Sequence, residues 1–96
     1  VRLALDLLAE IRERVEIPLV LHGGSGLSDV QFQAAAQGGI QKINIFTNLA
    51  VASKQRMIEN AQTENASLFS MTMQIRQAFR DECMRLLDVF CTTGKA

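Results

Sequence analysis

Residues 22–26, His-Gly-Gly-Ser-Gly, place the only histidine of the chain directly before a run of glycines. An imidazole can bind a metal ion, and backbone N–H groups at glycines can approach an anion closely. Ser28 follows, with Gln31 three residues later, which is the pattern that caps the start of a helix. Because the first turn of a helix attracts negative charge, the segment predicts a phosphate cradle beside a metal-binding side chain.

A second polar segment, residues 44–48 (NIFTN), also stands between a predicted strand and a predicted helix. It would present N–H groups and hydroxyls at the end of the strand. In barrels of eight strands and helices, phosphate commonly lies between the loops after strands seven and eight. The two segments together predict one anion site, with His22 at its mouth.

The first elements that must position these segments are a helix and a strand. Leucines and an isoleucine recur among charges over residues 3–14, which predicts an amphipathic helix that ends near Val15. Pro18 then stops the helix and opens a strand over residues 19–21. This Leu-Val-Leu run is continuously apolar, as expected of a parallel strand that is covered on both faces.

The next elements are a capped helix and a second strand. The helix begins near Ser28 and is closed after about nine residues by the glycine pair at 38 and 39. Residues 41–46 predict a strand, because their side chains alternate in character. Its two faces would carry Ile43 and Ile45 on one side and Lys42, Asn44 and Phe46 on the other.

Helices complete the chain. Thr47 or Asn48 is expected to cap a helix that runs to about residue 60, before the polar link of residues 61–67. One long helix is predicted from Leu68, with a buried stripe of Ile75, Phe79, Cys83, Leu86 and Phe90.

The two cysteines, Cys83 and Cys91, are both expected in that last helix. Eight residues of helix would separate their Cα atoms by about 12 Å, whereas a disulfide needs less than about 7 Å. They are therefore expected to be buried thiols.

The predicted order is helix, strand, helix, strand, helix, helix, which indicates a right-handed βαβ unit of an α/β fold. Two parallel strands leave both edges open, so further strands are expected from outside these 96 residues. Expressed by itself, the chain is expected to aggregate or to remain molten.

Composition excludes some partners. Ten basic and ten acidic side chains give a net charge of zero, so neither nucleic acid nor a membrane surface is an expected partner. No apolar run approaches the roughly 18 residues of a membrane-spanning helix, and a cytoplasmic location is expected.

Residues 18–29 (PLVLHGGSGLSD), residues 38–49 (GGIQKINIFTNL) and the ending TTGKA resemble the C-terminal third of the class II, zinc-dependent fructose-bisphosphate and tagatose-bisphosphate aldolases. The resemblance covers essentially the whole chain. Those enzymes are (β/α)8 TIM barrels. The resemblance therefore implies that residues 1–96 are the C-terminal fragment of a single aldolase barrel domain, with strands seven and eight and the flanking and C-terminal helices.

The resemblance also implies roles for single residues. His22 matches a ligand of the catalytic zinc ion. The phosphate of dihydroxyacetone phosphate would be held by Gly23, Gly24 and Ser25. Asn44 matches the asparagine that contacts the bound ketose, and Thr47 matches the threonine that closes the phosphate site.

Two positions depart from the family pattern. Phe46 stands where a small or acidic residue is usual, and Asn48 stands where an acidic residue is common. Because Phe46 shares a predicted strand face with Asn44, it is expected to face the substrate and to change the specificity.

The implied activity is that of a lyase of carbohydrate metabolism and glycolysis: reversible aldol cleavage of a ketose bisphosphate to dihydroxyacetone phosphate and an aldehyde. Zn²⁺ would polarise the ketone carbonyl. The proton-transfer aspartate and further zinc ligands are expected upstream, so no catalytic residue is assigned here and the 96 residues alone are predicted to be inactive. The full-length protein is expected to bind a phosphorylated sugar and to form a homo-oligomer.

Two other interpretations remain open. His-Gly-Gly after a strand also resembles the oxyanion-hole loop of lipases and esterases, although no serine of the chain lies in a G-x-S-x-G elbow. The chain could instead belong to a non-catalytic aldolase-like or phosphate-binding barrel subunit, in which His22 is merely packed. Zinc binding that depends on His22 would separate these interpretations.

Overall fold

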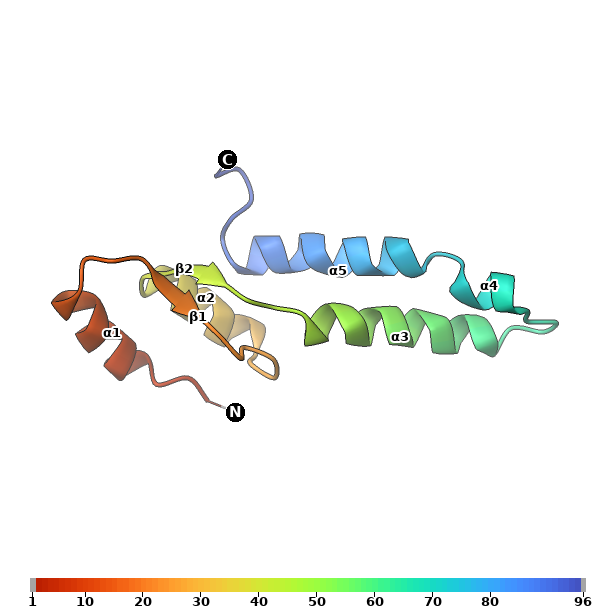
Figure 1. Ribbon diagram of the computed structural model, residues 1–96, viewed down its shortest axis with the longest axis horizontal. Coiled ribbons are helices and arrows are strands. Elements are labelled where there is room, and N and C mark those ends of the chain that lie inside the picture. The colour runs from red at the N-terminus through yellow and green to blue at the C-terminus, as the bar shows by residue number, and fades with distance from the viewer. Residues whose placement is uncertain (1, 96) are drawn as a thin grey trace. The chain divides into compact units, whose positions relative to one another are not determined.

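The computed structural model describes residues 2–95, which form helices and a two-stranded sheet (Figure 1). In chain order the elements are α1 (Leu5–Arg14), β1 (Leu19–Leu21), α2 (Asp29–Gln37), β2 (Ile40–Ile43), α3 (Thr47–Ala61), α4 (Leu68–Thr72) and α5 (Ile75–Val89). No helix within residues 2–95 is both long enough and apolar enough to cross a membrane.

The chain divides into two compact units. The first unit comprises residues 1–45 and 87–96, and the second comprises residues 46–86. The first unit therefore holds α1, both strands and α2, whereas the second holds α3, α4 and most of α5.

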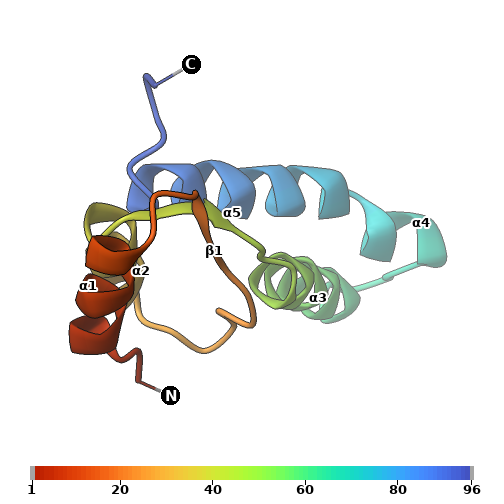
Figure 2. The same ribbon diagram turned by 60° about the vertical axis from the view of Figure 1, so that its left-hand side comes forward.

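The strands of the first unit confirm the predicted βαβ unit. β1 and β2 are parallel, with Val20 opposite Lys42 and Leu21 opposite Ile43. They lie side by side and are connected through α2 (Figure 2). The predicted capping box of α2 is also present: Ser28 Oγ accepts from the backbone N–H of Gln31, whose side chain accepts from the backbone N–H of Ser28.

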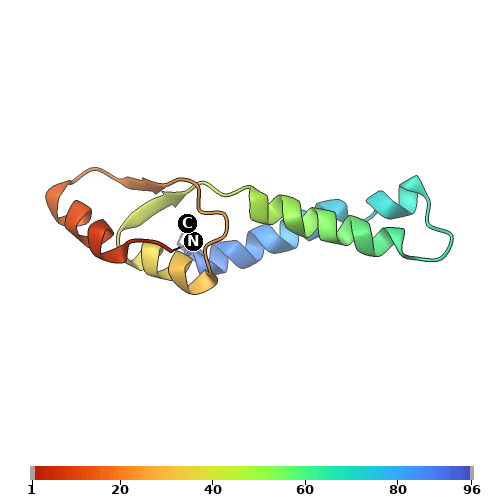
Figure 3. The ribbon, with the colours of Figure 1, turned by 90° about the horizontal axis from the view of Figure 1, so that it is seen from below.

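One face of the strand pair is packed and the other is open. Leu21 and Ile43 pack against a core of Leu27, Phe32 and Val89. In Figure 3, α1 and α2 lie on one side of the two strands. Val20, on the other face, is 43% exposed. The expectation of cover on both faces of this strand is thus met on one face only among the residues described.

The second strand is shorter than predicted. β2 ends at Ile43, and the following residue makes the last bond of the ladder, from Asn44 N to Leu21 O at 3.0 Å. Because β1 ends at Leu21, the partner strand offers no further pairing to residues 45 and 46. The expected side-chain cap by Thr47 or Asn48 is wrong as well: Phe46 is the N-cap of α3, and its carbonyl accepts from the N–H groups of Leu49 and Ala50.

The long C-terminal helix that the sequence predicts is broken in two. The chain turns between α4 and α5 at Gln74, which has a left-handed φ of 65°. Asn60 Nδ2 donates to the carbonyls of Met71 and Met73, at 3.2 and 2.8 Å. A side chain of α3 thus satisfies carbonyls near the end of α4, so the helix can stop there.

The expected burial of this region is only partly correct. Leu86 is fully buried, but Phe79 is 41% exposed. Cys83 is half-buried in α5, whereas Cys91 lies beyond the end of α5 and is exposed. The prediction of two buried thiols is therefore wrong for Cys91.

Candidate functional site

His22 and Asn44 come together where the two parallel strands end. His22 follows Leu21, the last residue of β1, and Asn44 follows Ile43, the last residue of β2. Because Leu21 and Ile43 are paired, the next residue of each strand lies beside the other. Asn44 Nδ2 is 2.9 Å from His22 Nδ1 and 3.3 Å from His22 Nε2. The structure thus brings together two of the predicted site residues.

The geometry of this contact leaves part of the imidazole available. The two ring nitrogens direct their lone pairs or N–H bonds away from each other, so one neighbouring atom cannot lie along both directions. Asn44 Nδ2 is close to both nitrogens, and at least one of them must therefore point elsewhere. Since His22 is also exposed, its ring can meet a further partner.

Lys42 extends this pair to three residues. Its Nζ donates to Oδ1 of Asn44, and the same amide presents Nδ2 to His22. The sequence placed Lys42 on the same strand face as Asn44 but assigned it no role. The i, i+2 spacing along a strand was the signal for this contact.

The glycine loop follows His22 directly. Gly23 and Gly26 have φ values of 66° and 94°, a region that other residues rarely adopt. A Cβ atom at Gly24 would lie 2.9 Å from Cε1 of Phe32, so only glycine lets the loop rest on the core without displacing this ring. Ser25 lies in the same loop and is half-buried. These residues are held against the first unit's core, just before α2.

Phe46 and Thr47 belong to the second unit. Phe46 is 68% exposed, and Thr47 is the exposed first residue of α3. Their predicted contacts with substrate remain predictions.

A metal ion would find one ligand here and not a complete site. Within residues 2–95, no three His, Cys, Asp or Glu side chains are grouped so that they could hold a metal ion. His22 is exposed and could supply this single ligand, and because a neutral imidazole has one lone pair, the ring binds a metal ion only when Asn44 Nδ2 does not donate to it.

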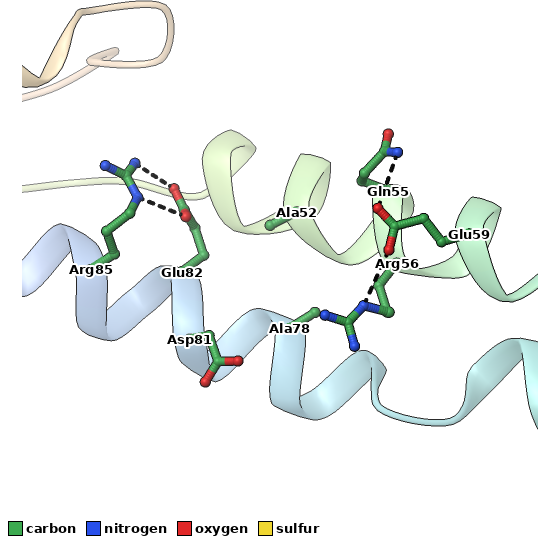
Figure 4. A pocket seen from close by; sticks show the side chains of 8 residues that line it. All are labelled: Ala52, Gln55, Arg56, Glu59, Ala78, Asp81, Glu82 and Arg85. Carbon is green, nitrogen blue, oxygen red and sulfur yellow. Dashed lines mark hydrogen bonds and ion pairs between the residues drawn. The ribbon is translucent and has the colours of Figure 1, made fainter.

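The second unit contains a groove of about 330 Å³ between α3 and α5, lined by charged side chains (Figure 4). These side chains bond to one another: Arg85 Nη2 lies 2.7 Å from Glu82 Oε1, and Arg56 Nε lies 3.6 Å from Glu59 Oε2. The charged side chains of this groove thus pair with one another within the second unit.

An α/β unit with polar side chains at the carboxyl ends of parallel strands is the arrangement found in α/β enzymes. Residues 1–95 match the family model of the class-II fructose-bisphosphate aldolases, and the chain belongs to this family. This match confirms the predicted resemblance to the class II aldolases, and the alternative interpretation as a lipase or esterase loop is wrong.

Relatives and a solved structure support the assignment. The uncharacterized protein YdjI of Escherichia coli K12 is 33% identical over 95 residues, which are 99% of this chain and 33% of YdjI. The crystal structure of the YdjI aldolase superimposes with a TM-score of 0.86 over 99% of this chain and 36% of that one. A fructose-bisphosphate aldolase of Ureaplasma parvum is 51% identical over 47 residues, or 49% of this chain and 16% of the relative. The chain thus spans about a third of the length of YdjI.

Proposed function

We propose that the chain is the C-terminal part of a (β/α)8 barrel, in which β1 and β2 are the seventh and eighth strands. The likeness to the YdjI aldolase, with a TM-score of 0.86 over about a third of that chain, supports this proposal. So does the open face of the strand pair, which carries Val20 and Lys42. In a closed barrel that face would be the inner one.

The activity proposed for the complete protein is reversible aldol cleavage of a ketose bisphosphate to dihydroxyacetone phosphate and an aldehyde. The observation that carries this proposal is the contact of His22 and Asn44 at the strand ends, with Nδ2 of Asn44 2.9 Å from the ring. In this function His22 is a zinc ligand, and Asn44 contacts the ketose. Zinc, when bound, supplies a Lewis acid for the ketone carbonyl.

The substrate's phosphate is assigned to the glycine loop. The N–H groups of residues 23–25 and the hydroxyl of Ser25 supply donors, and the capped start of α2 adds a positive dipole end. Thr47, three positions after Asn44, is the family's counterpart that closes the phosphate site. Phe46 introduces an aromatic side chain where the family usually has a small or acidic one, and it is proposed to select among ketoses.

The remaining machinery is assigned to other parts of the complete protein. These parts would supply the proton-transfer aspartate and the other zinc ligands. A cytoplasmic homo-oligomer that binds a phosphorylated sugar remains part of this proposal.

The test uses the full-length protein with fructose bisphosphate and tagatose bisphosphate as substrates. His22→Ala is expected to lower the zinc content per chain and to abolish cleavage, whereas Gln55→Ala, an exposed change on α3, should alter neither. Zinc content is measured by elemental analysis, and cleavage by the dihydroxyacetone phosphate released.

Two outcomes would contradict the proposal in different ways. Zinc content that His22→Ala leaves unchanged would contradict the ligand assignment. A protein that binds zinc through His22 but cleaves neither ketose would favour a non-catalytic aldolase-like subunit instead.

A further inference from the structure

We propose that a second copy of the chain docks on an apolar patch at α4, so that two subunits meet there around a two-fold axis. The α4 patch comprises Leu68, Phe69 and Met73, which are 79%, 75% and 47% exposed. The inference rests on the proposed function in one respect, because it names the surface of the homo-oligomer proposed there. It does not depend on the aldol chemistry or on zinc.

α4 exposes its apolar side chains instead of burying them. The helix lies at one end of the α3 and α5 pair (Figure 1), and among the residues that the structure describes none of its five is buried. Phe69 and Met73 are four positions apart, so they lie on the same side of the helical turn. Single exposed apolar side chains are normal on a protein surface, whereas a patch of large ones marks an interaction site.

Hydrogen bonds nevertheless fix the position of α4. Ser67 and Ser70 form a capping box at its start. Near its end, Asn60 of α3 donates to the carbonyls of Met71 and Met73. Ordering a segment costs conformational entropy, and α4 gains no burial of its own side chains in return. A partner surface that covers the α4 patch would supply this burial.

The count of helices favours another subunit as the occupant over a segment of the same chain. In the proposed barrel one helix follows each strand. Three helices, α3, α4 and α5, follow β2. Two of these three helices are therefore surplus to the cover of the barrel. A surplus helix that carries an exposed apolar patch fits a contact between subunits.

The charges around the patch favour a second copy over an unrelated partner. Residues 66–75 contain no charged side chain, so the patch can face its own copy without repulsion. Glu64 precedes this stretch, Arg76 follows it, and both are exposed. In a two-fold contact, residue i of one subunit meets residue j of the other, and j meets i. An antiparallel arrangement would therefore place Glu64 of each subunit near Arg76 of the other, with complementary charges.

The main experiment measures the molar mass of the full-length protein by sedimentation equilibrium. Phe69→Glu sets like charges against each other across the two-fold axis, and it should halve the mass by raising the dissociation constant at least about 100-fold. Gln55→Glu adds the same charge at an exposed position of α3 and should leave the mass unchanged. Because Phe69 is exposed in its own subunit, Phe69→Glu should barely alter the unfolding free energy of the dissociated subunit. If Phe69→Glu does not fold, Leu68→Ser carries the same test.

A charge swap tests the two-fold arrangement. Glu64→Arg places like charges near Arg76 at two symmetric contacts, and it should raise the dissociation constant about tenfold. Combining Glu64→Arg with Arg76→Glu exchanges both signs and should restore the original dissociation constant. Additive losses in the double variant would overturn the proposed arrangement.

The outcomes separate this surface from the proposed activity. An unchanged mass of Phe69→Glu would overturn the docking surface. A lower thermal midpoint without a lower mass would also overturn it, because a segment of the same chain would then cover the patch. A monomeric unsubstituted protein would remove the homo-oligomer together with its surface. If the full-length protein cleaves neither ketose but Phe69→Glu halves its mass, the proposed activity fails and the docking surface stands.

Discussion

The two units of the chain use their polar side chains differently. In the first unit, Lys42, Asn44 and His22 contact one another on the exposed face of two strand ends. In the second unit, polar groups bond along and between helices, as Arg56 does with Gln74 at 2.7 Å. The first unit thus gathers its polar side chains at the ends of strands, whereas the second spreads them along its helices.

The hydrophobic cores of both units are small, which limits the stability of the chain by itself. Among the residues described, the buried hydrophobic side chains number only eight. Large apolar side chains in both units stay exposed, such as Val30 at 74% and Leu68 at 79%. A core of this size does not offset the conformational entropy of about 96 residues.

The largest expected effect therefore concerns the chain by itself. Expressed without the remainder of a longer protein, residues 1–96 should show no cooperative thermal transition and should aggregate, because both sheet edges are open. Differential scanning calorimetry and light scattering provide the measurement. A sharp thermal transition of a soluble monomer would show that the two units are stable without further strands or helices.

The second prediction tests the core under the glycine loop. Phe32 is fully buried and packs edge-on against Phe90, with ring centroids 4.9 Å apart. Phe32→Ala in the full-length protein should lower the free energy of unfolding by about 3–5 kcal/mol. It should also raise KM for the ketose, since Gly24 loses the ring on which it rests.

Phe69→Ala in the second unit is the matched control. Phe69 is 75% exposed, so the same chemical change should cost less than about 0.5 kcal/mol and should leave KM unchanged. If denaturant titrations gave equal losses of unfolding free energy for Phe32→Ala and Phe69→Ala, the two positions would not differ in burial.

The third prediction adds a side chain where the loop meets this core. Gly24→Ala sets a methyl group 2.9 Å from Phe32 Cε1, and such overpacking should cost about 1–3 kcal/mol. Chemical denaturation measures the loss. The double variant Gly24→Ala with Phe32→Leu should be less destabilised than the sum of its single changes, because the smaller side chain leaves room. Strict additivity would contradict the proposed contact.

The fourth prediction concerns the helix break of the second unit. Asn60→Ala removes the donor that serves the carbonyls of Met71 and Met73, and it should cost about 1–2 kcal/mol. Zinc affinity and KM should not change, in contrast to the variants near the glycine loop. A loss of zinc in Asn60→Ala would show that the second unit supports the site directly.

The smallest expected effect lies in the charged groove. Glu59→Gln breaks the ion pair with Arg56, whose atoms are 3.6 Å apart and partly exposed. The cost should be below about 0.5 kcal/mol and should vanish at high salt. Thermal unfolding at low and high ionic strength checks this, and a salt-independent loss would contradict a surface ion pair.

Local patterns predicted much of the first unit. The Ser28 and Gln31 capping box, the helix end near Val15 and the apolar strand that opens after Pro18 all depend on neighbouring residues, and all appear in the structure. The adjacency of His22 and Asn44 followed because parallel strands place their carboxyl ends at one edge.

The errors arose where a distant residue decides the local structure. The break between α4 and α5 depends on Asn60, 13 positions before Met73, and helical periodicity continues across it. The end of β2 depends on where β1 stops. The alternation of residues 41–46 carries no information about the length of the partner strand. The contact of Lys42 with Asn44 depends on how the amide is turned, which no sequence pattern records.

The hydrogen bond from Asn44 N to Leu21 O makes the site depend on the register of β2 against β1. An insertion or deletion of one residue between Gly39 and Asn44 would exchange the two faces of β2 and would send both the amide and the ammonium into the packed side. The length of the chain is therefore fixed within these few positions.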